Sequence, residues 1–327
     1  MKYYRLQGVF TLRSPMSHIG ESHSTQSFLI TEPIIQECGE IEDVPVYNGN
    51  AWRGQLRDAG TEYMLDKLGT DSNPLRVPMD IFHLFFTGGR IGGDQKIDIA
   101  QARNIRKVVP LLSVFGGGVG NQIMEGKLRV SNGYPIVNEA IPVLPELWHN
   151  QARKIPVAAI TFDKSFSRMD DSKKESMQKY MPCLEQGLLE SEKRKTKTGN
   201  DVADQMRMTS ELWVPGTQIY QEIDILNASE VEMGALVSAM HWWSQSPHIG
   251  GQANKGHGKV NLAYRITEMH GDREESKDFM RVASGGPCLL AQSAENAKSA
   301  YDQHLRSVYD DMIAQDGNTM RKLIGEV

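Results

Sequence analysis

Residues 44–57 have the sequence VPVYNGNAWRGQLR, in which an extended segment changes into a helix. Asn50 is predicted to cap this helix, because its side-chain oxygen can accept a hydrogen bond from a free helical N–H. Arg53 and Arg57 lie four residues apart and share a face near the helix N-terminus. The apolar side chains recur at helical spacing and predict one buried stripe. They are Trp52, Leu56, Ala59 and Tyr63.

Further strands and helices are predicted on both sides of this segment. Alternating or continuous apolar runs predict strands at residues 2–12, 28–31, 127–130, 155–162, 218–226 and 259–266. Helical spacing predicts helices near residues 79–86, 172–189, 231–243 and 290–315. Short strands and helices that alternate, with long insertions between them, indicate an α+β fold with a split βαβ, ferredoxin-like core.

The composition limits the kinds of function. Of 327 residues, 39% are apolar and 24% charged, which is typical of an ordinary globular protein. The net charge of −5 excludes a protein that is basic all over its surface, so a nucleic-acid site must be a local patch. The three cysteines are far apart and form no CxxC pair. No signal peptide or membrane-spanning run is found, so we expect a cytoplasmic protein with no membrane partner.

A glycine-rich loop at residues 249–259, with the sequence IGGQANKGHGK, is a candidate phosphate site. Glycine lets backbone N–H groups approach a phosphate closely, and Lys255 and His257 add donors. The loop is not a Walker A motif, because His257 and Gly258 stand where Lys and Ser or Thr are required. A structural turn before a strand is the simpler interpretation of this loop taken alone.

Other motifs do not develop into catalytic or cofactor sites. Residues 116–120, GGGVG, lack the closing glycine of a dinucleotide fingerprint, and we expect a mobile or a close-packed backbone segment there. His18 and His23 do not have the spacing of a zinc-binding HExxH motif. We find no nucleophile elbow and no carboxylate pair in a recognisable motif. The sequence therefore predicts no catalytic residue, no cofactor and no metal.

Two segments combine basic and apolar side chains. Residues 70–110 carry Arg103 and Arg106, and we expect them to form an insertion with basic loops. Residues 193–213 begin with KRKTK and continue to Met206-Arg207-Met208, which is usual for a solvated loop. Alternatively, the basic groups would follow phosphates while an apolar side chain wedges between bases.

Several stretches together resemble the repeat-associated mysterious protein (RAMP) superfamily, and within it the CRISPR backbone subunits. The loop at 15–20 (PMSHIG) is similar to the family's loop after the first strand, and residues 44–57 to its strand-to-helix segment. Residues 114–116 (VFG) with 126–130 (GKLRV) resemble its central region, and 249–259 its C-terminal glycine loop. The matches occur in the family's order over residues 1 to 265.

This resemblance implies one domain over residues 1–327, with a modified RNA-recognition palm, helical fingers at 70–110 and a β-hairpin thumb at 190–215. In such subunits the thumb covers the neighbour's RNA, and an apolar residue near its tip displaces a base. Met206 and Met208 are the candidates here. The RNA-binding residues predicted in this way are Ser17, His18, His23, Asn50, Arg53, Arg57, Arg103, Arg106, Lys195, Met206, Arg207, Met208, Gly250, Gly251, Asn254, Lys255 and His257.

The resemblance also implies the partners. They are guide RNA (crRNA), neighbouring copies of the chain, other CRISPR effector subunits and a complementary target strand. Target-cleaving relatives carry an aspartate in the loop after the first strand, and this chain has none between Met1 and Glu42. It therefore looks most like the type IV backbone subunit, and we expect a scaffold rather than an enzyme.

Two other functions stay open from the residues. A RAMP-superfamily endoribonuclease would process or cleave RNA with His18 or His23. A metal-dependent hydrolase without nucleic acid would use the same histidines as ligands, with Glu21 as the local carboxylate.

Overall fold

The computed structural model describes residues 3–69, 75–89, 99–119, 122–167, 207–270 and 273–308. Its large sheet contains β1 (Tyr3–Leu12), β8 (Leu128–Val130), β9 (Tyr134–Pro135), β12 (Gln218–Leu226), β13 (Val260–His270), β14 (Arg273–Val282) and β15 (Cys288–Leu290). A four-stranded sheet contains β2 (Ile19–His23), β3 (Gln26–Leu29), β10 (Thr161–Ser167) and β11 (Arg207–Trp213). Two hairpins pair β4 (Thr31–Ile35) with β5 (Ile41–Pro45), and β6 (Gly117–Val119) with β7 (Gln122–Met124).

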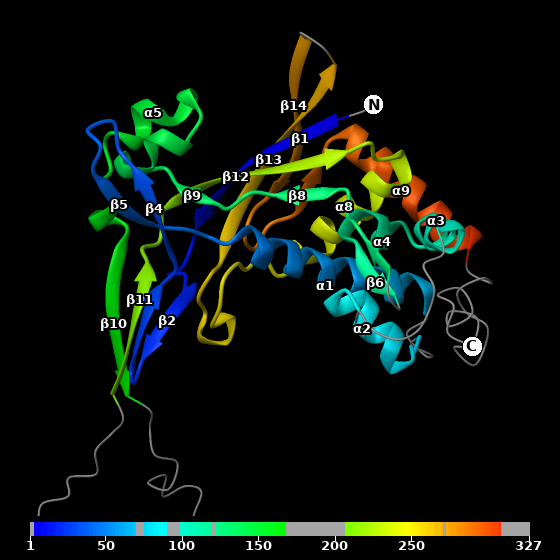
Figure 1. The fold of residues 1–327 in the computed structure, drawn as a ribbon, viewed down its shortest axis with the longest axis horizontal. Helices are drawn as coiled ribbons and strands as arrows, with labels where there is room; N and C mark the ends of the chain where they lie inside the picture. The colour runs from blue at the N-terminus through cyan, green and yellow to red at the C-terminus, as the bar shows by residue number, and fades with distance from the viewer. Residues whose placement is uncertain are drawn as a thin grey trace, which may run out of the picture.

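The helices are α1 (Gly49–Leu68), α2 (Met79–Thr87), α3 (Ile99–Val108), α4 (Pro110–Phe115), α5 (Glu146–Ala152), α8 (Glu230–Trp243) and α9 (Gln292–Ser307). Three short 3-10 helices are η1 (Asn138–Val143), η2 (Val157–Ala159) and η4 (Ala253–Lys255). Figure 1 shows α1, α8 and α9 on one side of the large sheet, while the four-stranded sheet extends away from it.

The large sheet confirms the predicted α+β class. Its order is β15-β14-β13-β1-β12-β8, and all of these neighbouring pairs are antiparallel. Along the chain, β1, α1, β8, β12, α8 and β13 follow one another in the order βαββαβ. The alternation in β1 predicted its inner face correctly, because Leu6, Phe10 and Leu12 are buried.

Two local predictions were wrong. The cap of α1 is Asn48, whose side chain accepts from the Asn50 amide, so the helix begins two residues earlier than expected. Residues 155–162 do not form one strand, because η2 occupies 157–159 and β10 starts at Thr161. Pro156 has no amide hydrogen for a sheet ladder, and the Val157 amide instead donates to Glu139.

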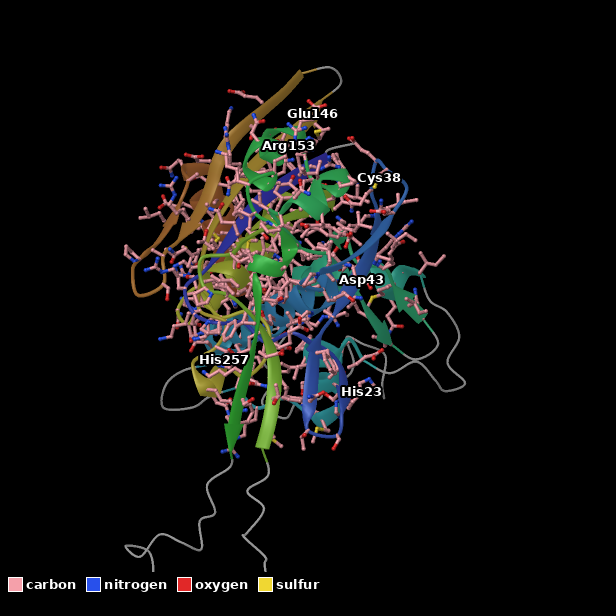
Figure 2. All side chains as sticks on the ribbon, turned by 90° about the vertical axis from the view of Figure 1, so that its left-hand side faces the viewer. His23, Cys38, Asp43, Glu146, Arg153 and His257 are labelled. Atoms are coloured by element: carbon pink, nitrogen blue, oxygen red, sulfur yellow. The ribbon has the colours of Figure 1, made fainter. Side chains whose placement is uncertain are left out.

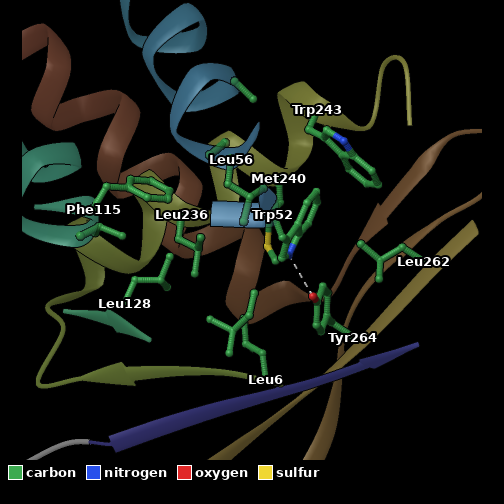
Figure 3. Packing of buried hydrophobic residues seen from close by; sticks show 14 of the residues in the cluster. Leu6, Trp52, Leu56, Phe115, Leu128, Leu236, Met240, Trp243, Leu262 and Tyr264 are labelled. Atoms are coloured by element: carbon green, nitrogen blue, oxygen red, sulfur yellow. Dashed lines mark hydrogen bonds between the residues drawn. The ribbon is translucent and has the colours of Figure 1, made fainter. Parts of the chain in front are cut away.

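Aromatic side chains join α1 to the sheet, and Figure 3 shows Trp52 beside Trp243 and Tyr264. The Trp52 ring packs edge-on against Phe10 of β1 and Trp243 of α8, with centroids 5.2 and 4.7 Å apart. Its indole N–H donates to the hydroxyl of Tyr264 over 3.2 Å, and this hydroxyl donates to the side-chain oxygen of Gln221. All five side chains are buried, so α1 is fixed in height and rotation above the sheet.

Tyr264→Phe tests this buried link. Removing the hydroxyl leaves the Trp52 N–H and the Gln221 oxygen without their partner, so the free energy of unfolding should fall by roughly 2–4 kcal/mol. Tyr4→Phe is the matched control, since no hydrogen bond to the Tyr4 hydroxyl is found in the described part of the chain. Denaturant unfolding measures both, and an equal loss in the two variants would contradict the role of the link.

Candidate nucleic-acid interface

Arg53 and Arg57 converge on one hollow beside α1. Both guanidinium groups donate to the backbone oxygen of Phe115, at the end of α4, and the Arg57 bond is 2.6 Å long. The hollow has a volume of about 560 Å³ and lies between α1, α2 and the β6–β7 hairpin. The helical spacing of the two arginines therefore does place them together, as predicted.

Glycine backbone forms much of the wall of this hollow. Gly88, Gly89, Gly116, Gly117, Gly118 and Gly126 all line it. At Gly88 the backbone φ is 86°, and an added Cβ would lie 2.3 Å from Nη1 of Arg57. Glycine is required there both by the left-handed backbone and by the close approach of the guanidinium. The segment at 116–120 is close-packed in its described part, which is one of the two expected outcomes, and it also forms a wall of the site.

The electrostatics of the hollow favour an anion. Within the described residues, no carboxylate lies within ion-pair distance of Arg53 or Arg57, and the buried Nε of Arg53 has no hydrogen-bond partner. Burial, and then the charge of Arg53, lowers the pKa of Arg57. The charge of the neighbouring Asp58 acts in the opposite direction and raises the pKa of Arg57. Because neither guanidinium group forms an ion pair in the described structure, the two cations still repel each other, and a phosphate group would relieve this repulsion while accepting several N–H bonds.

His18 connects the loop after β1 to the start of α1. Its Nε2 accepts a hydrogen bond from the Asn48 amide over 3.1 Å, and its ring packs 5.2 Å from that of Tyr47. This amide is one of the free N–H groups at the helix N-terminus, so neutral His18 helps to cap α1. Arg53 and Arg57 lie within about 14 Å of Asn48 along the helix axis, because the helix rises about 1.5 Å per residue.

The glycine-rich loop contacts the same loop after β1. The amides of Gly251 and Gly258 donate to the backbone oxygens of Ser17 and Pro15 over 2.6 and 2.8 Å. The Ser17 hydroxyl and His257 Nδ1 are both buried, and neither has a hydrogen-bond partner in the described structure. The glycine backbone of the loop can approach an anion closely, so this loop is a second candidate anion contact.

Basic side chains surround the loop. The ammonium group of Lys255 lies 4.1 Å from the ring centroid of Phe166 on β10, while Asn254 is exposed beside it. Burial first, and then the charges of Lys164 and Lys255, lowers the pKa of His257. The predicted residues Ser17, His18, Gly250 and Gly251 therefore lie in one region with Lys255 and His257, although Ser17 and His257 are buried within it. Asn50 is exposed at the start of α1.

The other predicted residues lie on β2, α3 and β11 or outside the described residues. His23 is exposed on β2, 3.4 Å from Glu21, and Figure 2 shows it apart from His257. Arg103 and Arg106 lie on α3, where Arg106 donates to the backbone oxygen of Glu125 over 2.7 Å. Met208 is on β11 opposite Phe166, and Arg207 begins that strand. Lys195 and Met206 lie outside the described residues.

The sequence missed some members of the site. Gly88, the Phe115 oxygen and Lys164 come from segments that are distant in sequence, and only the folded chain brings them to the arginines or the glycine loop. The adjacent glycines Gly88 and Gly89 in the sequence do indicate a turn, and the structure gives Gly88 a positive φ.

Within the described residues, no group of three metal-binding side chains is found. None of the described helices is long and apolar enough to cross a membrane.

The pKa of His18 gives a pH test of the helix cap. Burial lowers this pKa below 6.5, so the unfolded chain takes up a proton that the folded protein resists. The free energy of unfolding should therefore decrease as the pH falls from 7.5 to 5.5, by up to roughly 1.4 kcal/mol per pH unit for this group. His18→Gln keeps an acceptor for Asn48 but does not titrate, so its decrease should be shallower. Identical slopes in urea unfolding would contradict this assignment.

No family model matches the sequence, and no curated protein matches it. Among solved structures, the fold is similar to a chain of the "Type IV-B CRISPR Complex", with a TM-score of 0.53 and 18% sequence identity. The match covers 83% of this chain and 92% of that chain. The protein therefore shares its fold with a chain of a type IV CRISPR complex, as the resemblance in its sequence predicted.

Proposed function

We propose that this protein is a non-catalytic backbone subunit of a CRISPR ribonucleoprotein, in which identical copies assemble along guide RNA. The observation that carries the proposal is the pair Arg53 and Arg57, which share one glycine-lined hollow. Glu125 is the carboxylate in its lining, and it makes no ion pair with either arginine in the described structure. RNA phosphates would occupy this hollow and the glycine loop. The bases would then face away from the protein and pair with a target strand, so that pairing supplies the sequence specificity.

The insertions fit the same proposal. On this interpretation, α2 and α3 belong to the fingers, and β10 with β11 forms the stem of the thumb. Lys255 of the glycine loop contacts Phe166 on that stem, so RNA held by the loop would pass next to the thumb. Weak binding by each copy would be sufficient, because neighbours on one strand raise the effective concentration.

An endoribonuclease that uses His18 has less support. The Nε2 atom of His18 is occupied by the Asn48 amide, and burial favours the neutral ring. A general acid needs a proton that it can transfer at neutral pH, and His18 in this environment holds none on that atom. His23 is exposed and lies on a different part of the surface from the arginine hollow.

RNA that copurifies with the protein provides the direct test. Nuclease treatment of the purified protein, followed by sequencing of the protected fragments, should yield RNA that contains CRISPR repeat sequence. Incubation with precursor RNA should give no defined cleavage. Defined cleavage that His18→Ala abolishes would overturn the scaffold proposal, as would stoichiometric zinc in protein that carries no RNA.

Arg53→Ala should weaken RNA binding and also flatten its dependence on salt. Each neutralised phosphate of a single strand contributes a slope of about −0.7 in log affinity against log salt, so the variant should lose about 0.7. Arg306→Ala removes an exposed arginine on α9 and is the control of equal charge. Filter binding over a salt series measures both. An unchanged slope for Arg53→Ala would place phosphates elsewhere.

Gly88→Ala should reduce RNA affinity through the position of Arg57. The new methyl group would collide with Nη1 of Arg57 and push the guanidinium out of the hollow. Gly216→Ala is the matched control, since Gly216 has a similar φ of 92° but nothing within 4 Å of the added Cβ. Both variants should lose about 1 kcal/mol of stability from the backbone strain. An equal RNA affinity in the two variants would contradict the assignment.

A further inference from the structure

One end of the molecule carries an acidic face with exposed apolar side chains. The β4–β5 hairpin presents the exposed carboxylates Glu37, Glu40, Glu42 and Asp43, and Glu146 of α5 is exposed at the same end. Figure 2 views this end directly, with Cys38, Asp43, Glu146 and Arg153 around it. Arg153 and Lys154 are also exposed after α5, so the exposed acidic groups named here outnumber the basic ones by five to two.

The apolar part of the acidic face comes from the same elements. Ile35 and Ile41 are cross-strand partners and are 65% and 67% exposed, while Leu147 of α5 is 68% exposed. The Gln36 side chain donates to the backbone oxygen of Glu139 over 2.9 Å and joins the hairpin to η1, the element before α5. Exposed apolar groups that gather beside charges are typical of a protein interface.

The opposite end carries a basic face. Arg76, Arg103 and Lys107 are exposed around α2 and α3, and Glu125 is an exposed carboxylate of the same end. Three large apolar side chains accompany them and are between 41% and 69% exposed. They are Met79, Phe82 and Ile99. Figure 1 shows α2 and α3 at one end of the long axis, and β4, β5 and α5 at the other.

We propose that the acidic face of one copy docks on the basic face of the next, so that a second copy of this chain is the partner of both surfaces. Opposite charges attract the two faces, and the exposed apolar side chains on each supply the area that becomes buried. Each face repels its own kind, so a symmetric dimer through either face is disfavoured. A contact between unlike surfaces at opposite ends repeats without closing on the partner and gives a chain of copies.

This inference rests on the proposed function, because a backbone along guide RNA needs such a repeating contact. It also assigns Arg103 to a neighbouring copy rather than to RNA. The exposed apolar groups around α2 and α3 favour protein over RNA, since phosphates would be recognised by the cations alone. The acidic face would repel RNA, so RNA binding does not account for the exposed apolar side chains at both ends of the molecule.

Cross-linking tests the contact directly. Cys38 is an exposed free thiol on the acidic face, and Arg103→Cys places a second thiol on the basic face. A bis-maleimide should then join successive copies, so that covalent dimers, trimers and longer species appear on a denaturing gel. The ladder should disappear in Arg103→Cys/Cys38→Ser. It should also be missing in Lys277→Cys, which places the thiol on β14. A ladder of equal strength in either control, or none with Arg103→Cys, overturns the interface.

Charge reversal gives an independent measurement. Glu37→Lys/Glu42→Lys and Arg103→Glu/Lys107→Glu should each weaken self-association by about tenfold, as measured by sedimentation with and without the copurified RNA. The chain that carries all four substitutions should regain it, because the complementarity is restored with opposite signs. The four side chains are exposed, so the fold should tolerate the changes. Failure of the fourfold variant to recover would contradict the proposal.

A third measurement distinguishes failure of this inference from failure of the proposed function. It is the affinity for a single-stranded RNA short enough to be covered by one copy. Under the proposal, both charge-reversed pairs bind this RNA as the unmodified protein does, because they leave Arg53 and Arg57 in place. If Arg103→Glu/Lys107→Glu lost this affinity, the basic face would be an RNA site and the docking proposal would be wrong. If the unmodified protein bound no short RNA while the ladder formed, the interface would stand and the proposed function would fail.

Discussion

The buried hydrogen bond from Trp52 to Tyr264 connects the helix that carries the site to the sheet that supports it. Its energy is modest, but breaking it would leave polar atoms buried without partners, and that cost is what fixes the geometry. Tyr264 fits because it faces Gly8, where an added Cβ would lie 2.2 Å from the ring. A glycine in β1 thus makes room for the ring that positions α1, and the first turns of α1 carry Arg53 and Arg57.

The arginine hollow shows how a protein with a net charge of −5 can present a strong local positive field. The Phe115 oxygen accepts from both guanidinium groups and holds them together, although it neutralises neither charge. The surrounding glycines keep side chains out of the space between α1 and the β6–β7 hairpin. An anion that enters this space would meet donors already in position, so little ordering is needed on binding.

Sequence alone predicted the parts of the fold that depend on local periodicity. The strand at β1, the stripe of α1 and the helix at α8 follow from the spacing of apolar residues. It failed at residues 155–160, where Pro156 and a contact to Glu139 decide the conformation. It also misplaced the helix cap, because Asn48 and Asn50 are equally good capping residues and only the path of the backbone distinguishes them. For the site, the arginine pair was predictable from helical spacing, whereas the wall of glycines depends on contacts between distant segments.

The charges of the described residues are divided by location, and this division would suit the two tasks of the proposed scaffold. RNA binding needs cations that point at phosphates, whereas assembly needs surfaces that recognise another copy and not themselves. The structure places Arg53 and Arg57 inside a hollow, and it places Arg103 and the carboxylate of Asp43 at opposite ends. An evenly basic surface would bind RNA anywhere and in any register. Confining the cations to a hollow, and giving the two ends opposite charge, would make the repeat of the proposed assembly depend on protein contacts as well as on phosphates.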